Sequence, residues 1–349
     1  MPSVTENSPA EITSLHRARK QGRKFQNPVD TRMAGASLLP KVLKLYLTNK
    51  DERSPKKALG PFSTDVRIYE KPPSSGLRIT WMGHSSLLIE LDGVRLLVDP
   101  VWDERASPVP WLGPKRFFAA PLRLDQLPPL DAVLISHDHY DHLGKRTIQE
   151  LARLLPRATT QWITSLGVGR RLRGFGVTGA IVELDWTDSV TVTANGAHLQ
   201  ITALPARHFS GRGVLDRFNT LWSSFVLKGN RHNIYYGADS GLWDGFAEIG
   251  REFGPFDLAM LEVGAYNELW KAIHMGPVGA AQAFTALGAT GLLMPIHWGL
   301  FELAPQAWRE PIERIVALAD QAGIKLWTPQ PGVPTNLLKG QEVRSNWWN

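Results

Sequence analysis

The sequence contains no cysteine among its 349 residues. This absence excludes disulfide bonds, thiolate nucleophiles and cysteine-ligated zinc, so any bound metal must use His, Asp or Glu. No apolar run approaches the roughly 18 residues of a transmembrane helix, and residues 1–16 lack the continuous apolar core of a signal peptide. We therefore expect a protein that is neither secreted nor membrane-spanning, with a cytoplasmic location.

Charge is unevenly distributed along the chain. Residues 1–60 carry 12 Lys and Arg against 5 Asp and Glu, whereas the remainder carries 27 against 28. No helix-turn-helix, zinc finger or aromatic-basic RNA motif accompanies the excess, so we expect no nucleic-acid partner. With 43% hydrophobic and 21% charged residues, the composition is that of a globular protein. We predict a basic N-terminal extension (1–60), packed on or near a main domain (61–349).

The segment 38–47 of the extension can form a short helix. It would place Lys41 and Lys44 on one side, with leucines around the rest. One interpretation is an interfacial element that binds an anionic membrane surface, which would make the protein peripherally membrane-associated. The other is a helix packed on the main body, with its lysines in solvent.

The main domain begins with strands and continues with strand–helix alternation. Strands are expected at 77–81, 86–91 and 94–99, with Asp92-Gly93 as a two-residue hairpin turn. A buried strand at 132–135 precedes a helix near 144–155. Further along we expect a hairpin over 191–201, a turn at 229–230, strands near 257–263 and 291–296, and helices near 276–287 and 306–322. This pattern predicts an α/β fold of two mixed sheets packed face to face, with helices outside.

The segment 136–142, Ser-His-Asp-His-Tyr-Asp-His, follows the buried strand directly and holds four metal-binding side chains within six residues: His137, His139, Asp141 and His142. An extended start puts the first two on one side of the chain, and a turn at the second two aims them at a neighbouring point. Imidazoles and a carboxylate without thiolates suit zinc, manganese or iron. The spacing therefore predicts a metal site.

This segment resembles the His-x-His-x-Asp-His signature of the metallo-β-lactamase superfamily. Further blocks resemble the N-acylphosphatidylethanolamine-hydrolysing phospholipases D and their bacterial relatives: Thr80–His84, Leu97–Pro100, Arg105–Pro108, Gly113–Phe117, Glu183–Trp186, Gly254–Leu258, Gly264–Tyr266 and Ile296–Gly299. The likeness covers most of the chain, from about Phe25 to near the C-terminus. It implies a four-layer αββα sandwich of two mixed sheets flanked by helices.

The resemblance also implies a site with two zinc ions per chain, or manganese or iron in their place. The implied ligands are His137, His139 and His208 for the first ion, Asp141, His142 and His297 for the second, and Asp239 as the bridging carboxylate. From the residues alone, His208, Asp239 and His297 each follow an apolar, strand-like stretch, where loops gather at a sheet edge. That position agrees with the implied set.

Further roles follow from the same resemblance. Two metals would produce a metal-bridging hydroxide as the nucleophile, and the implied catalytic residues are Asp141, Asp239 and His274. His274 matches a family histidine near the substrate, where it could bind the phosphate or protonate the leaving oxygen, although a buried structural histidine would fit as well. Asp99 resembles a residue that orients metal ligands, and His84 could do likewise.

Aromatic residues flank the expected site. Trp111, Tyr266 and Trp270 could line an apolar groove for acyl chains, and core packing would explain each of them equally well. The chain departs from the family here. Asn267–Trp270 stands where the family commonly has Pro-Arg-Trp, and Pro110–Leu112 where the animal enzyme has Gln-Tyr.

We predict a zinc-dependent hydrolase, of phospholipase D type, that releases N-acylethanolamine and phosphatidic acid from N-acylphosphatidylethanolamine. The expected partner is a lipid or a small phosphodiester or ester, and the animal relative hints at a homodimer. One alternative is a lactonase or small-molecule phosphodiesterase on the same two-metal site. Two others are a di-iron oxidoreductase, which typically has a carboxylate where His139 stands, and a non-catalytic membrane-binding protein.

Overall fold

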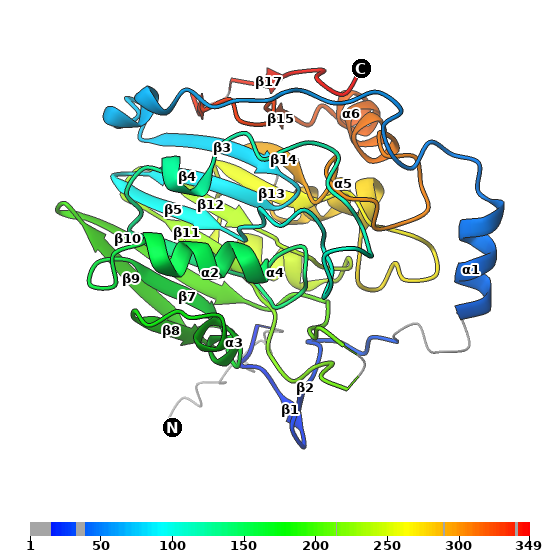
Figure 1. Ribbon diagram of the computed structural model, residues 1–349, viewed down its shortest axis with the longest axis horizontal. Coiled ribbons are helices and arrows are strands. Elements are labelled where there is room, and N and C mark those ends of the chain that lie inside the picture. Colours follow the sequence, from blue (N-terminus) through cyan, green and yellow to red (C-terminus); the bar gives the residue numbers. More distant parts are fainter. Residues whose placement is uncertain (1–14, 33–38, 214, 289, 339–340) are drawn as a thin grey trace, which may run out of the picture.

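The computed structural model describes residues 15–32, 39–213, 215–288, 290–338 and 341–349. Two sheets form its centre (Figure 1). The seven-stranded sheet has the order β16 (Thr335–Asn336), β3 (Leu77–Gly83), β4 (Ser86–Leu91), β5 (Val94–Val98), β6 (Ala132–Ile135), β7 (Gln161–Ser165) and β8 (Ile181–Leu184). The six-stranded sheet has the order β14 (Leu292–Ile296), β13 (Leu258–Glu262), β12 (Asn233–Tyr236), β11 (Ser224–Lys228), β10 (Ala197–Leu204) and β9 (Ser189–Ala194).

The sheets pack face to face because their strands are apolar on both sides. On β4, Leu87 and Ile89 face the core between the sheets, whereas Leu88 faces a second cluster with helices α2 (Lys145–Leu154) and α3 (Gly169–Gly174). Helices α4 (Gly245–Phe253), α5 (Gly276–Ala286) and α6 (Glu310–Ala322) contribute to the core of the six-stranded sheet. The predicted αββα sandwich is confirmed.

Local predictions agree with the strands and turns observed. Asp92 and Gly93 have φ of 49° and 96°, and Asn195 and Gly196 have φ of 51° and 80°, as two-residue hairpin turns require. Helix α4 was not predicted from the sequence, because Gly245 and Gly250 weaken its pattern. It forms because its apolar side chains, Phe246 and Ile249, are buried against the sheet.

The described part of the extension lies against the main domain. The hairpin β1 (Lys20–Gln21) and β2 (Lys24–Phe25) is anchored by Phe25, which is buried in a cluster with Trp186 and Trp222. Helix α1 (Leu39–Thr48) lies at the edge of the molecule (Figure 1). Two short strands near the C-terminus, β15 (Trp327–Thr328) and β17 (Val343–Arg344), pair with each other. No helix in the described ranges is long and apolar enough to cross a membrane.

Candidate metal centre

The ends of several strands meet at one edge of the sandwich. His137 follows β6, Asp239 follows β12 and His297 follows β14. Strands β12, β13 and β14 are parallel, so their carboxyl ends lie side by side. The topology thus brings together side chains that lie up to 160 positions apart in the chain.

Four side chains form a first group: His137, His139, His208 and Asp239, whose ligand atoms all lie within 4.8 Å of one another. Nδ1 of His139 lies 2.9 Å from Nε2 of His137 and 3.3 Å from Nε2 of His208. Three ring nitrogens thus converge on one point, which is the arrangement of a histidine metal site.

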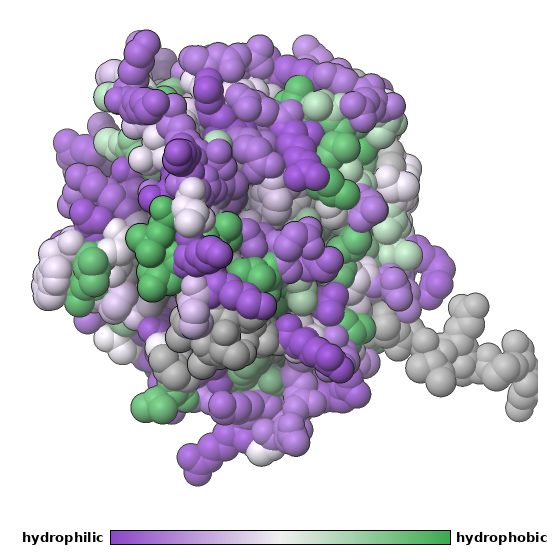
Figure 2. Space-filling model, turned by 90° about the vertical axis from the view of Figure 1, so that its right-hand side faces the viewer, coloured by the Kyte–Doolittle hydropathy of each residue, from purple (hydrophilic) through white to green (hydrophobic). Residues whose placement is uncertain are grey.

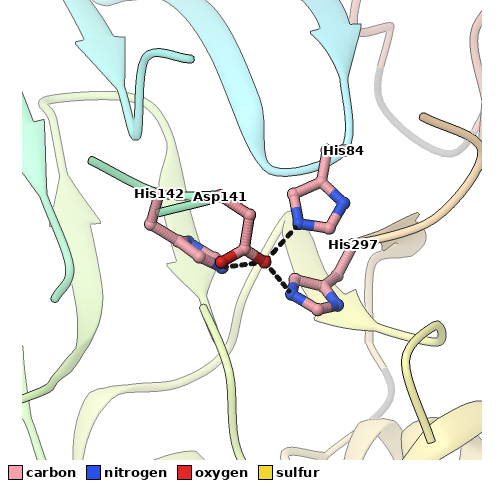
Figure 3. Close-up of side chains that lie close together, drawn as sticks. All are labelled: His84, Asp141, His142 and His297. Atoms are coloured by element: carbon pink, nitrogen blue, oxygen red, sulfur yellow. Dashed lines mark hydrogen bonds and ion pairs between the residues drawn. The ribbon is translucent and has the colours of Figure 1, made fainter. Parts of the chain in front are cut away.

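A second group contains His84, Asp141, His142 and His297 (Figure 3). Oδ2 of Asp141 is 2.9 Å from Nε2 of His84, 3.2 Å from Nε2 of His297 and 3.7 Å from Nε2 of His142. All three rings point toward this carboxylate. The structure places His84 in direct contact with Asp141, as a residue that orients this carboxylate would be.

Asp239 lies between the two groups. Its Oδ2 is 3.1 Å from Nε2 of both His142 and His297, 3.5 Å from Nε2 of His208 and 3.7 Å from Nε2 of His137. Its Oδ1 is buried and has no hydrogen-bond partner among the described residues. A carboxylate in this position can bridge two cations.

The outer nitrogens of the rings are held by hydrogen bonds. Nδ1 of His142 donates to Asp99 at 2.8 Å, and Nδ1 of His208 donates to the carbonyl of Ile273 at 2.9 Å. Asp99 also accepts from the hydroxyls of Ser136 at 2.6 Å and Tyr236 at 2.5 Å. These bonds leave Nε2 of each ring free to face the centre, as in known metal sites.

Three of these side chains come from strained backbone positions. His84, Asp99 and His297 have φ of 55°, 39° and 63°, in the left-handed region that residues other than glycine rarely adopt. Each such residue costs on the order of 1–3 kcal/mol. Strain of this kind collects at functional sites, where it directs side chains that a regular strand would point elsewhere.

Burial and charge set the protonation of the centre. Burial lowers the pKa of His137 and His208 well below the usual value, and that of His139 to about 4. Burial also lowers the pKa of His142, but the carboxylates of Asp239 and Asp141 outweigh it and raise that pKa well above the usual value. The lowered pKa values of the first group favour neutral imidazoles, which is the form that binds a metal ion.

A cavity of about 380 Å³ opens onto both groups. Its walls include the apolar side chains Val42, Phe209, Trp270, Ile273 and Leu303, together with Tyr46 of α1 and the site residues His139, Asp141, Asp239, His274 and His297. Trp270 thus lies where a substrate-binding residue is expected.

The other two aromatic candidates lie elsewhere. Trp111 is 75% exposed and does not line this cavity. The hydroxyl of Tyr266 donates to Glu310, and only its neighbour Ala265 reaches the cavity wall. Their positions give no support to the prediction that they bind substrate there.

One acidic residue beside the two groups was not predicted from the sequence. Glu262, the last residue of β13, is fully buried, and its Oε2 lies 2.5 Å from Nδ1 of His274. Burial raises the pKa of Glu262, although His274 opposes that shift. Its position at a strand end is the signal it shares with Asp239, but it belongs to no spaced motif.

Comparison with known proteins identifies the family. The model of the beta-lactamase superfamily domain matches residues 94–298, which is more than half of the chain. The chain belongs to the metallo-β-lactamase superfamily. The resemblance inferred from the motifs is thereby confirmed, and the protein is a metal-dependent hydrolase of this superfamily.

Individual relatives extend the likeness. An uncharacterised protein of Mycobacterium tuberculosis is 45% identical over 262 residues, which cover 74% of this chain and 68% of that protein. The N-acyl-phosphatidylethanolamine-hydrolyzing phospholipase D 1 of Caenorhabditis elegans is 34% identical over 315 residues, which cover 86% of this chain and 88% of that protein. The structure of isothiocyanate hydrolase from Delia radicum gut bacteria is 19% identical and covers 74% of this chain and 99% of that chain, with a TM-score of 0.59. At that identity it shows the fold alone.

The donor set of this metallo-β-lactamase homologue fits divalent metal ions. The two groups offer only imidazole nitrogens and carboxylate oxygens, which suit zinc, manganese and iron alike. The buried, unpartnered Oδ1 of Asp239 would gain a partner when a cation binds.

Proposed function

We propose that the protein is a di-zinc phosphodiesterase of phospholipase D type, which hydrolyses N-acylphosphatidylethanolamine to N-acylethanolamine and phosphatidic acid. The observation that carries this proposal is the position of Asp239 between two groups of donors, at the floor of a cavity with apolar walls. The similarity to the Caenorhabditis elegans phospholipase D supports the choice of substrate.

The seven predicted ligands divide between the two groups: His137, His139 and His208 would hold one ion, Asp141, His142 and His297 the other, and Asp239 both. Two bound divalent ions would supply a hydroxide nucleophile near neutral pH and neutralise charge on the reacting phosphate. We propose zinc as the native metal, with manganese and iron as alternatives that elemental analysis distinguishes.

The remaining residues of the site would orient the metal ligands or contact the substrate. Asp99 fixes the ring of His142, and His84 fixes the carboxylate of Asp141. His274 lies on the cavity wall, where its ring can reach the ester oxygens of a bound substrate. Trp270 and Ile273 exclude water from the side of the cavity where an acyl chain would begin.

The size of the cavity favours one specific alternative. About 380 Å³ holds a head group and part of one chain, but not the three acyl chains of the proposed lipid. Either the chains remain outside the cavity, or the substrate is smaller, such as a lactone or a soluble phosphodiester. The volume of the cavity therefore supports a lactonase or small-molecule phosphodiesterase as the second candidate function.

We also propose that α1 docks the enzyme on an anionic membrane, which would leave the acyl chains outside the cavity. Val42 and Tyr46 of this helix face the cavity, whereas Leu43 and Leu47 are 61% and 76% exposed and lie among the lysines of the same helix. Figure 2 shows that apolar and hydrophilic groups alternate across the face that carries α1. A homodimer stays a prediction.

The test is to present zinc-loaded protein with N-acylphosphatidylethanolamine in mixed micelles and to identify the products by mass spectrometry. N-acylethanolamine and phosphatidic acid, absent after chelation, would support the proposal. No product from protein that holds two metals per chain would contradict the lipid substrate. The same preparation would then be assayed on lactones and soluble phosphodiesters.

A further inference from the structure

Glu262 is held on three sides at the base of the cavity. Its Oε1 accepts from the backbone N–H of Met275 at 2.8 Å and, more weakly, from that of Ser240 at 3.4 Å. Its Oε2 accepts from Nδ1 of His274 at 2.5 Å. The side chain is completely buried. A carboxylate fixed in this way cannot turn, so it also fixes its third partner, the imidazole of His274.

This contact decides which nitrogen of His274 is available. Since Nδ1 donates to Glu262, only Nε2 can contact a molecule in the cavity that the ring lines. The ring is further confined by His297, stacked at a centroid distance of 5.2 Å, and by the edge of His208 at 5.0 Å. His274 therefore presents one nitrogen, in one orientation, beside the two groups of donors.

The ligand atoms of Glu262, His274, Asp239 and His297 lie within 4.8 Å of one another, so a further metal site needs to be considered. The hydrogen bonds of Glu262 and His274 argue against a third metal ion at this position. Both oxygens of Glu262 are engaged by N–H groups, and the Nδ1 atom that would face such an ion carries the proton donated to Glu262. The pair is satisfied without a cation.

We propose that Glu262 is a positioning residue, which holds His274 so that Nε2–H is directed at the leaving oxygen of the substrate. The inference rests on the proposed phosphodiesterase function and narrows its substrate class. A proton donor at this place is needed for an alkyl ester, whose alkoxide is a poor leaving group. An aryl ester with an acidic phenol does not need one.

The step balances in atoms and electrons. A bond forms between phosphorus and an oxygen from water, and the bond between phosphorus and the alkyl oxygen breaks. The alkyl oxygen keeps the electron pair of that bond and takes the proton of Nε2. His274 is left neutral with its Nδ1–H on Glu262, and the proton released by the attacking water restores the ring through solvent.

The experiment compares two substrates in the zinc-loaded enzyme: an N-acylphosphatidylethanolamine and a p-nitrophenyl phosphodiester. For Glu262→Gln we expect kcat on the alkyl ester to fall about 100-fold with KM within about threefold, since a positioned proton donor contributes about 100- to 10,000-fold. On the nitrophenyl ester the loss should stay below about fivefold. His274→Asn should give the same pattern, and the double variant should lose little more than either one. Equal losses on both esters would overturn the proposal.

Glu90→Gln is a matched control, because Glu90 is also a buried acid, 5% exposed and paired with Arg78 and Arg95, and it does not line the cavity. Any loss of rate in Glu90→Gln should be the same for the alkyl ester and the nitrophenyl ester.

If Glu262→Gln fails to fold, His274→Asn carries the test, because it removes the donor without removing the buried acid. Elemental analysis should find the wild-type metal content in every variant, and loss of metal from Glu262→Gln would overturn the positioning role in favour of a ligand role.

A measurement that does not depend on turnover can test the positioning role of Glu262 separately from the proposed function. In long-range ¹H–¹⁵N spectra at the pH of maximal activity, the wild-type ring of His274 should carry a proton at Nδ1 as well as the proton at Nε2. Glu262→Gln should remove the Nδ1 proton, because the amide can donate where the carboxylate accepted. If the lipid is not a substrate but this loss of the Nδ1 proton is seen, the positioning holds and the proposed substrate fails. An unchanged spectrum would contradict the positioning whatever the enzyme hydrolyses.

Discussion

The metal centre and helix α1 border the same cavity but differ in almost every other respect. Most side chains of the centre are buried, they follow the ends of strands, and hydrogen bonds hold several of them in place. Helix α1 lies at the edge of the molecule, with exposed leucines and lysines on its outer side. If the proposed function is correct, the two regions have different tasks: the buried centre carries the chemistry, and helix α1 controls which molecules reach the cavity.

If the centre is the catalytic part, removing a ligand should have the largest effect of any change. We expect chelation or His137→Ala to lower the rate at least about 1,000-fold, because the ions supply the nucleophile. Elemental analysis and turnover would be measured together. His198→Ala is the matched control, since His198 is exposed on β10 and should leave both unchanged. If His137→Ala loses its metal but keeps the function of the protein, a non-catalytic role for the metal centre would be favoured.

Asp239→Asn tests the bridge between the two groups. The amide keeps the size of the side chain but loses the charge that faces both groups, so we expect a loss of about 100-fold or more in rate. The fold should survive, because neighbouring hydrogen bonds are unchanged, and the melting temperature would check this. Turnover close to that of the wild type would rule out the bridging role.

Asp99→Asn should have a smaller effect, because Asp99 acts through His142. We expect metal affinity to fall about 10- to 100-fold, the usual effect of losing an acceptor behind a metal-bound histidine. Titration with a competing chelator would measure it, and kcat at saturating zinc should stay within about tenfold. Unchanged affinity would mean that the bond between Asp99 and His142 does not tune the site.

The smallest effect is expected on the outer side of α1. Leu43→Glu with Leu47→Glu should weaken binding to anionic liposomes several-fold, while turnover of a soluble ester stays unchanged. Deleting residues 1–48 should weaken the same binding in a salt-dependent way. Leu154→Glu is the control, because Leu154 is 45% exposed on α2. Liposome binding that resists both changes would leave α1 a purely structural helix.

The two regions also differ in how far the sequence could predict them. His137, His139, Asp141 and His142 share one short segment after an apolar strand, so their spacing alone indicates a site. His208, Asp239 and His297 were implied by the family resemblance, and their positions after strand-like stretches agreed with it. The structure brings all seven residues together. Their roles as ligands stay predictions.

Residues whose role depends on distant contacts were harder to predict. Glu262 was missed because one acid at the end of an apolar strand has no spaced partner in the sequence. Trp111 was placed near substrate because it flanks a family-like block, but an aromatic side chain in a loop carries no signal of its direction. The contribution of Val42 and Tyr46 to the cavity depends on how α1 packs, which local patterns do not determine.

The most direct test of the two-metal centre is anomalous diffraction at the zinc absorption edge from crystals grown with zinc. We expect two peaks, one enclosed by His137, His139 and His208 and the other by Asp141, His142 and His297, with Asp239 in contact with both. A single peak, or two peaks away from Asp239, would contradict this expectation.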